Sequence, residues 1–171
     1  IENVRLYESL QQAHADLEVR VQQRTAEIAA LYRISEATQA ASNPDELFAS
    51  IHAIIGELMP AKNFYIALYD AAADSIHFPY YSDEVDAVPP AECRRGLTDY
   101  VLRTGRPLLA LPQTYAELVE QGEVERVGPP PIDWLGVPLK SQRGETIGVM
   151  TVQTYTAETR LTEAHQAILM F

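Results

Sequence analysis

The sequence offers few residues that could carry out covalent chemistry, and the most reactive of them is a cysteine. Cys93 is the only cysteine in 171 residues, and Arg94 and Arg95 follow it directly. Neighbouring positive charges lower a thiol pKa and favour the reactive thiolate, but a lone thiol has no internal partner for a disulfide. The arginine pair could instead hold an anionic ligand, although the acidic segment DEVDAVPPAE just before it favours simple charge compensation.

The histidines show no catalytic or metal-binding pattern. They are scattered along the chain, at His14, His52, His77 and His165. None belongs to an HExxH motif or to a pair with metal-ligand spacing, and the sequence contains no GxSxG or Walker motif. His165 precedes Gln166, whereas the phosphoacceptor histidine of kinases usually precedes Glu, so we interpret it as an ordinary helix residue. We therefore expect no catalytic residues and no metal ligands.

Composition and charge exclude several classes of protein. With 47% apolar residues the chain can form an ordinary hydrophobic core. Its formal net charge of -11 disfavours a surface for nucleic acid or anionic lipid, because both need clustered Lys and Arg. No segment resembles a signal peptide, and no apolar run approaches the roughly 20 residues that a membrane span needs. We expect a soluble, cytoplasmic fragment, although its parent protein could be anchored in a membrane elsewhere.

Residues 1–41 contain neither Gly nor Pro and predict one long helix. At about 1.5 Å per residue it would be roughly 60 Å long, which is more than a domain of this size needs. A heptad seam with two polar interruptions runs along it, through Leu10, His14, Leu17, Val21, Arg24, Ile28 and Leu31. We expect the first half to form a two-stranded coiled coil with a second copy, in which His14 and Arg24 fix the register. From Ile28 to Ala41, an amphipathic helix lying along its own domain is an equal alternative.

Residues 42–171 predict an α+β domain built on two β-hairpins. The apolar period is 2 in NFYIALYD and SIHFPYY, which a short turn joins, and again in DWLGVPLKS and ETIGVMTVQTY, which QRG joins. Between the hairpins, PLLAL predicts a short further strand. Together these segments indicate a central, largely antiparallel sheet.

Helical segments flank these strands. Asn43 as N-cap, Pro44 at the first helical position and Glu46 completing a capping box with Asn43 predict the start of a second helix, which Pro60 ends. LTDYVLRT and TYAELVEQ predict two short helices between the hairpins, and Thr162 predicts the cap of a final helix that the chain end truncates. This order places helices on one face of the sheet and leaves loops and short helices to roof a pocket on the other.

Two longer segments and the end of the chain resemble the GAF domain, a small-ligand sensor module of bacterial signalling proteins. They are GLTDYVLRTGRPLLA (96–110), DWLGVPLKSQRGETIGVMTVQTY (133–155) and LTEAH. The resemblance covers about residues 28–171. It implies a non-catalytic sensory and dimerisation module that binds a small molecule and relays the binding through coiled-coil helices.

The first helix carries a resemblance of its own. LEVRVQQRTAEIAALYRISEA is similar to the helical linkers of histidine kinases and diguanylate cyclases, and IENVRLYESL resembles the exit helix of an upstream GAF module. The resemblance implies a bacterial signalling protein, such as a two-component histidine kinase. An upstream sensor and a downstream output domain would be covalently linked to this fragment.

Strand parity identifies the candidate pocket residues. If the large aliphatic side chains of 63–70 face the helices, Tyr65 and Tyr69 point to the roofed face. Thr151 and Gln153 are polar residues in an otherwise apolar strand, so they need partners in a ligand, in water or in the roof. The full candidate set is Tyr65, Tyr69, Tyr81, Tyr100, Trp134, Thr151 and Gln153. The alternative is an ordinary core in which these polar groups bond one another, and the chain would then be a ligand-free structural dimerisation module.

The resemblance also disfavours the cofactors found in some relatives. Relatives that attach a bilin have a histidine after the cysteine, whereas Arg94 follows Cys93. The methionine sulfoxide reductases with this fold use several cysteines, and the Asn-Lys, Phe and Asp-Glu signature of cyclic-nucleotide-binding members is not found. The scattered histidines give no haem site. We expect no required cofactor, an unidentified small-molecule ligand, a second copy as partner, and no contact with nucleic acid or membrane.

Overall fold

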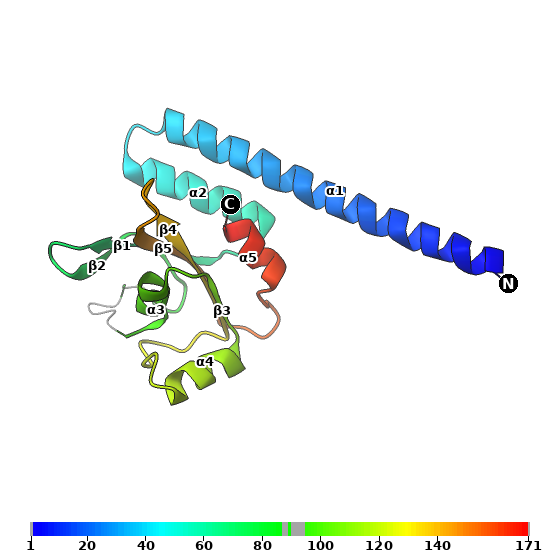
Figure 1. Ribbon diagram of the computed structural model, residues 1–171. Helices are drawn as coiled ribbons and strands as arrows, with labels where there is room; N and C mark the ends of the chain where they lie inside the picture. The colour runs from blue at the N-terminus through cyan, green and yellow to red at the C-terminus, as the bar shows by residue number, and fades with distance from the viewer. Residues whose placement is uncertain (1, 87–88, 90–94, 171) are drawn as a thin grey trace.

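A computed structural model describes residues 2–86, 89 and 95–170, with side chains from Arg5 onward. The helices and strands are α1 (Glu2–Ala40), α2 (Pro44–Leu58), β1 (Asn63–Asp70), β2 (Ser75–Ser82), α3 (Leu97–Thr104), β3 (Leu108–Ala110), α4 (Pro112–Glu120), β4 (Asp133–Lys140), β5 (Thr146–Thr154) and α5 (Glu163–Leu169). Every helix and strand that the sequence predicts is present, and the α+β architecture is confirmed (Figure 1).

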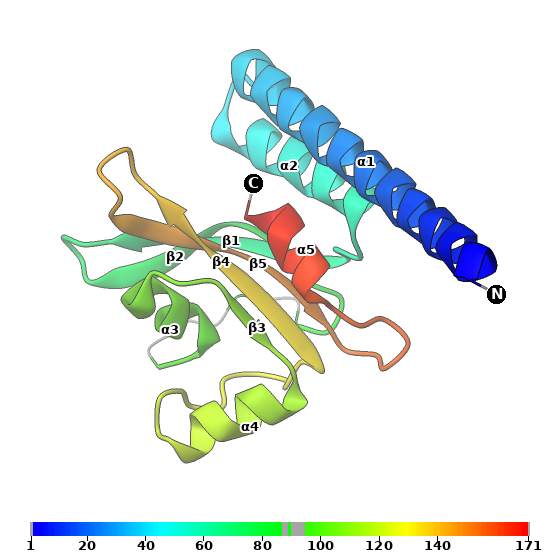
Figure 2. The same cartoon turned by 45° about the vertical axis from the view of Figure 1, so that its right-hand side comes forward.

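The strands form one antiparallel sheet in the order β2-β1-β5-β4-β3. Both predicted hairpins are present, since β1 pairs with β2 and β4 pairs with β5. The two hairpins join through β1 and β5, the first strand of one and the last strand of the other. The short strand β3 pairs with the free edge of β4. Helices α1, α2 and α5 lie on one side of this sheet, and α3 and α4 lie on the other (Figure 2).

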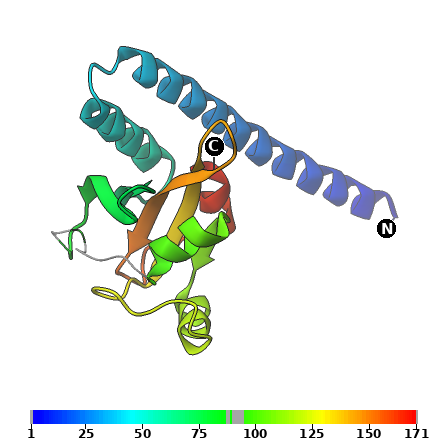
Figure 3. The ribbon, with the colours of Figure 1, turned by 60° about the vertical axis from the view of Figure 1, so that its left-hand side comes forward.

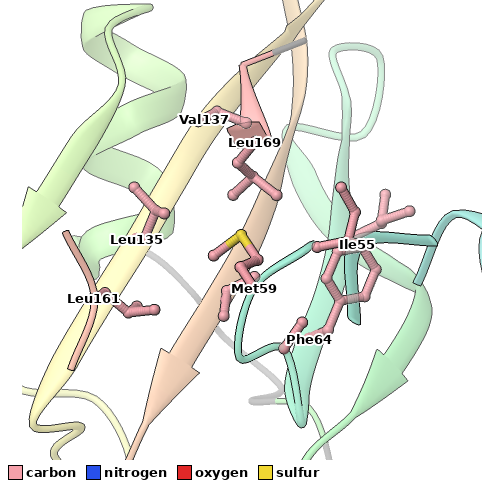
Figure 4. Close-up of a cluster of buried hydrophobic side chains, with 10 residues drawn as sticks. Ile55, Met59, Phe64, Leu135, Val137, Leu161 and Leu169 are labelled. Atoms are coloured by element: carbon pink, nitrogen blue, oxygen red, sulfur yellow. The ribbon is translucent and has the colours of Figure 1, made fainter. Parts of the chain in front are cut away.

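Alternating side chains of the strands fill two separate cores, one on each face of the sheet. On the α2 and α5 face, Phe64 of β1 and Leu135 of β4 pack with Ile55 and Leu169 (Figure 4). On the opposite face, the second core contains Trp134, Val149, Leu97, Val101, Ala110, Leu118 and Val124. The large aliphatic face of β1 therefore meets the helices, as strand parity predicts.

The helix α1 is 39 residues and roughly 58 Å long, and its N-terminal half extends beyond the domain (Figure 3). The predicted seam residues are exposed along its length, at Leu10, His14, Leu17, Val21, Arg24, Ile28 and Leu31. Within the helix, His14 Nδ1 lies 3.5 Å from the Glu18 carboxylate, and Arg24 pairs with Glu27 at 3.1 Å. An exposed apolar seam of this length is a surface that a partner can cover.

A different side of α1 packs on the domain in its second half. This side consists of buried and half-buried residues at Glu27, Ala30, Ile34 and Ala37. Arg33 clamps the carboxylate of Glu57 in α2 through both terminal guanidinium nitrogens, with Nη2 2.9 Å from Oε1. The sequence left two alternatives for Ile28 to Ala41, and they are not exclusive: the helix lies along its own domain and still leaves the seam exposed.

The caps of two helices differ in detail from the sequence prediction. Asn43 Oδ1 accepts the Glu46 N–H (3.0 Å) as predicted, but the Glu46 carboxylate accepts from the Ser42 N–H (3.0 Å) and not from Asn43. At α5, Thr162 and His165 form a reciprocal capping box in which His165 Nδ1 accepts the Thr162 N–H (3.2 Å). His165 is therefore a capping residue and not merely an ordinary helix residue. Burial lowers its pKa, which favours the neutral ring that can accept this bond.

Candidate functional site

A cavity of about 70 Å³ lies between the second face of the sheet and the segments that cover it. The strands line it with Tyr65, Phe78, Tyr81, Trp134 and Gln153. The covering segments line it with residues that include Asp86, Thr98, Tyr115, Glu125 and Tyr155. A polar space of this size can hold several water molecules or a small ligand.

A chain of hydrogen bonds connects the floor of the cavity to its cover. The indole Nε1 of Trp134, on β4, donates to the hydroxyl of Tyr65, on β1, at 3.0 Å. The Tyr65 hydroxyl lies 2.9 Å from Oγ1 of Thr98, in the first turn of α3. Because the Tyr65 oxygen accepts the indole proton, its own proton is available to Thr98. The position of α3 is therefore tied to the two strands beneath it.

Trp134 holds its position because Gly136 leaves room for the indole. A Cβ added at Gly136 would lie 2.1 Å from Cη2 of Trp134, far inside contact distance. Trp134 and Gly136 are two residues apart on β4, so they share the cavity face of the sheet. Glycine is needed at this position for space, and the indole lies over it as part of the floor.

A second polar cluster forms one end of the cavity. Asp83 Oδ2 accepts hydrogen bonds from Gln153 Nε2 at 2.6 Å and from the Tyr155 hydroxyl at 3.1 Å. Burial, and then the charge of Asp83, raise the pKa of Tyr155 far above its usual range, so this hydroxyl stays protonated. The other Asp83 oxygen accepts the backbone N–H groups of Val85 and Asp86, at 2.9 and 2.8 Å. Asp83 thus fixes the turn that carries Asp86 to the cavity wall.

The covering segments are tied together by Arg95. Its Nη1 pairs with Glu125 Oε1 at 2.8 Å, and its carbonyl accepts the Glu125 N–H at 2.6 Å. Its Nη2 also donates to the carbonyl of Gly122 at 3.2 Å. The sequence predicted that the arginine pair compensates the acidic segment before it, but Arg95 pairs with a residue that follows α4. Arg94 and Cys93 lie outside the described residues.

The structure brings together four of the seven candidate pocket residues, namely Tyr65, Tyr81, Trp134 and Gln153. The remaining three lie outside the lining. Tyr69 is near the end of β1, beyond the cover, and its hydroxyl donates to Asp74 in the hairpin turn at 2.9 Å. Tyr100 packs in the second core, with the Arg103 guanidinium over its ring at 5.4 Å.

Thr151 is the third candidate outside the lining, and it lies inside the sheet. It pairs with Tyr65 of β1 on one side and with Gly136 of β4 on the other. Its side chain is fully buried, and Oγ1 makes no hydrogen bond within the described structure. Thr151 therefore packs beneath the cavity without reaching it.

Several lining residues were missed from the sequence, most clearly Phe78. Strict alternation from Tyr81 would place Pro79 and not Phe78 on the cavity face. The pairing of β1 with β2 shifts register between Ile66 and Leu68, which is the signature of a bulge. Pro79 could have signalled it, because proline in a strand favours edges and bulges.

The comparisons with known proteins agree with this architecture. A family model for the GAF domain matches residues 41–171. This chain belongs to the GAF domain family. GAF domains are generally non-catalytic sensory modules and are typically parts of multidomain proteins. No curated protein matches the sequence at a significant level.

Solved structures with the same fold share little sequence with this GAF domain. The GAF domain of a phosphoenolpyruvate-protein phosphotransferase from Coxiella burnetii is 16% identical, with 84% of this chain and 86% of that chain covered and a TM-score of 0.63. The free methionine-R-sulfoxide reductase from Neisseria meningitidis, in complex with its substrate, is 15% identical, with 84% and 81% covered and a TM-score of 0.64. The A. aeolicus nlh2 GAF domain in an inactive state is 15% identical, with 86% and 88% covered and a TM-score of 0.60.

Within the residues that the structure describes, no group of three or more His, Cys, Asp or Glu side chains is arranged to hold a metal ion. None of the described helices combines the length and the apolar composition that a bilayer span requires.

Proposed function

We propose that this GAF domain binds a small molecule in the cavity and relays the binding to paired α1 helices of a bacterial, cytoplasmic signalling protein, such as a histidine kinase or diguanylate cyclase. The observation that carries this proposal is that one sheet separates the cavity from the helical layer. Tyr65 lines the cavity, and its neighbours Phe64 and Ile66 point into the core beneath α2 and α5. A ligand that displaces β1 therefore disturbs both faces of the sheet.

A series of side-chain contacts connects β1 to α2 and α2 to α1. Phe64 stacks on the ring of His52 in α2, with centroids 4.7 Å apart and ring planes within 8°. His52 is itself held at both ring nitrogens, by the Ala61 carbonyl at 2.6 Å and the Tyr80 hydroxyl at 2.8 Å. The Arg33 to Glu57 pair then links α2 to α1. For signalling, the ligand must prefer one arrangement of these contacts over another, because only differential affinity shifts a conformational equilibrium.

Ligand binding is tested by thermal unfolding of the full chain with a panel of small metabolites. A ligand at 100 times its dissociation constant adds about 2.7 kcal/mol to the free energy of unfolding, which is a rise in Tm of roughly 5–10 °C for a chain of this length. We expect at least one compound to produce this rise and to change the fluorescence of Trp134, the only tryptophan. If no compound does so, the rival function, a ligand-free structural dimerisation module, is favoured.

Dimerisation through the seam is tested by cysteine crosslinking in a Cys93→Ser background. Val21 belongs to the seam, and Val19 lies on the opposite side of α1 with similar exposure, 62% against 56% for Val21. We expect Val21→Cys to form a disulfide-linked dimer efficiently under mild oxidation and Val19→Cys to remain monomeric on a denaturing gel. Equal yields from the two variants would show that any crosslinking is collisional and that the seam is not the interface.

A further inference from the structure

The floor of the cavity is a cluster of aromatic rings in mutual contact. Tyr65 stacks on Tyr81 with centroids 5.6 Å apart, and Phe78 contacts both of them edge-to-face at 5.6 and 5.8 Å. Trp134 lies beside them and donates its indole proton to Tyr65. The face of an aromatic ring carries partial negative charge, so a group of rings around a small space attracts a cation.

Two side chains that line the cavity have acceptor oxygens with no partner among the described residues. Asp86 is half-buried in the wall, and within the described structure its carboxylate makes neither a hydrogen bond nor an ion pair. Gln153 is only 8% exposed, and because its Nε2 donates to Asp83 and to the Tyr155 hydroxyl, its Oε1 is the atom left without a partner in the described residues. A ligand that carries N–H donors could therefore bond to both of these acceptors.

The charges around the cavity favour a positive ligand. No lysine, arginine or histidine is among the lining residues that the structure describes. Of the nearby carboxylates, Glu125 is paired with Arg95, whereas Asp83 accepts only neutral donors and Asp86 has no partner in the described residues. Burial raises the pKa of Tyr115, a lining residue on α4, and the nearby charge of Arg126 partly opposes this effect. Among the described residues, the carboxylates near the cavity that no cation pairs with are therefore those of Asp83 and Asp86.

One feature of the cavity would favour an anion. The first turn of α3 lines it, and Gly96 provides no side chain to cap that turn, so its free N–H groups carry partial positive charge. However, α3 has only eight residues, and the Thr98 hydroxyl in this turn is already bonded to Tyr65. A carboxylate charge is larger than the partial charge of a helix end, and the Asp86 carboxylate has no partner among the described residues.

We propose that the cavity binds a small organic cation, whose ammonium group faces the rings of Tyr65, Phe78 and Tyr81 and the carboxylate of Asp86. This inference rests on the proposed sensing function and names the chemical class of its ligand.

The proposal is tested by binding measurements on the full chain with small molecules that are similar in shape and are positively charged, neutral or negatively charged. Choline is the cation, 3,3-dimethylbutan-1-ol is its uncharged isostere, and 3,3-dimethylbutanoate is an anion of similar size. Butylammonium and butan-1-ol form a second pair for cations that carry N–H donors. Each probe is titrated at equal ionic strength, with Trp134 fluorescence and calorimetry as readouts. We expect at least one cation to bind ten times more tightly than its neutral isostere. Equal binding of cation and isostere in both pairs, or tighter binding of the anion, would overturn the proposal.

Substitutions of lining residues test whether the cation binds in the cavity. Asp86→Asn keeps the shape of the side chain and removes its charge, so we expect at least tenfold weaker binding of the cation and an unchanged Tm without ligand. Phe78→Leu should weaken it several-fold through the loss of a ring. Glu158→Gln removes an exposed charge outside the cavity and is the matched control. Wild-type cation affinity in Asp86→Asn would refute the assignment.

The failures of the two proposals are distinguishable. If the cations fail while a neutral or anionic metabolite raises Tm and changes Trp134 fluorescence, the ligand class is wrong and the sensing function stands. If neither the cations nor any metabolite of the panel binds, the sensing function itself is wrong.

Discussion

Replacement of Gly136 by alanine is expected to lower stability by about 1–3 kcal/mol, the usual cost of overpacking a core, and to abolish ligand binding in the cavity. The added Cβ would lie 2.1 and 2.6 Å from two indole carbons of Trp134. Trp134 is only 2% exposed, so the indole must move toward the cavity and lose its hydrogen bond to Tyr65. Urea unfolding gives the stability loss. The emission maximum of Trp134, which should shift to longer wavelength as the indole contacts water, reports the displacement.

Two further variants show whether a clash is the cause. Gly56 is an exposed glycine of α2 with no atom within 4 Å of an added Cβ, so Gly56→Ala should be neutral or slightly stabilising. Adding Trp134→Phe to Gly136→Ala replaces the indole with a smaller ring and should recover part of the stability that alanine alone removes. A Gly136→Ala protein with wild-type stability and emission would contradict the proposed role of this glycine.

Replacement of Asp133 by alanine is expected to destabilise the domain by about 2–4 kcal/mol, somewhat less than the full cost of breaking a buried ion pair because Arg160 is partly solvated. Asp133 is fully buried at the start of β4. Its carboxylate accepts from Arg160 Nε at 2.8 Å and Nη2 at 2.9 Å, and from the Leu161 N–H at 2.8 Å. These bonds hold the segment between β5 and α5 against the sheet. Urea unfolding at neutral pH measures the loss.

The matched control for Asp133 is an ion pair at the surface. Arg103 and Glu123 are 2.8 Å apart, and both are well exposed. Glu123→Gln should therefore change the free energy of unfolding by less than about 1 kcal/mol. Arg160→Lys should have an intermediate effect, because lysine keeps the charge and loses the two-pronged geometry. Equal losses of unfolding free energy in Asp133→Ala and Glu123→Gln would show that burial of the carboxylate does not determine the size of the loss.

The sequence predicted the sheet well because period-2 patterns and turn residues are local signals. Strand parity placed Tyr65 on the cavity face, and the need of a buried polar side chain for a partner pointed to Gln153 on β5. Parity failed where regular alternation stops. The bulge in β2 brings Phe78 to the cavity face. Tyr69 lies near the end of β1, where its hydroxyl donates to Asp74 in the turn and not into the cavity.

The cover of the cavity could not be predicted from local patterns. Asp83, Asp86 and Tyr155 lie just beyond the ends of strands, where their positions depend on contacts between segments distant in sequence. The bond from Gln153 to Asp83 joins residues 70 positions apart. A parity argument cannot find such a pair, because it says nothing about the direction of a side chain outside a regular strand.

The position of α1 was ambiguous in the sequence for a different physical reason. The side that packs on the domain in the second half includes Ala30 and Ala37, which are small and give a weak apolar signal. The seam, with Val21 and Ile28, gives a strong one. In the sequence, only the seam is therefore recognisable as a contact side of α1. The second contact side is recognised only in the structure, where it packs against α2.

These two sides of α1 are about 120° apart around the helix axis, at about 100° per residue. In the proposed dimer, each domain would then lie beside the helix pair and not on its far side. A continuous helix has no joint between the two sides. In the proposed dimer, a rotation of the domain side of α1 would therefore also turn the seam against its partner.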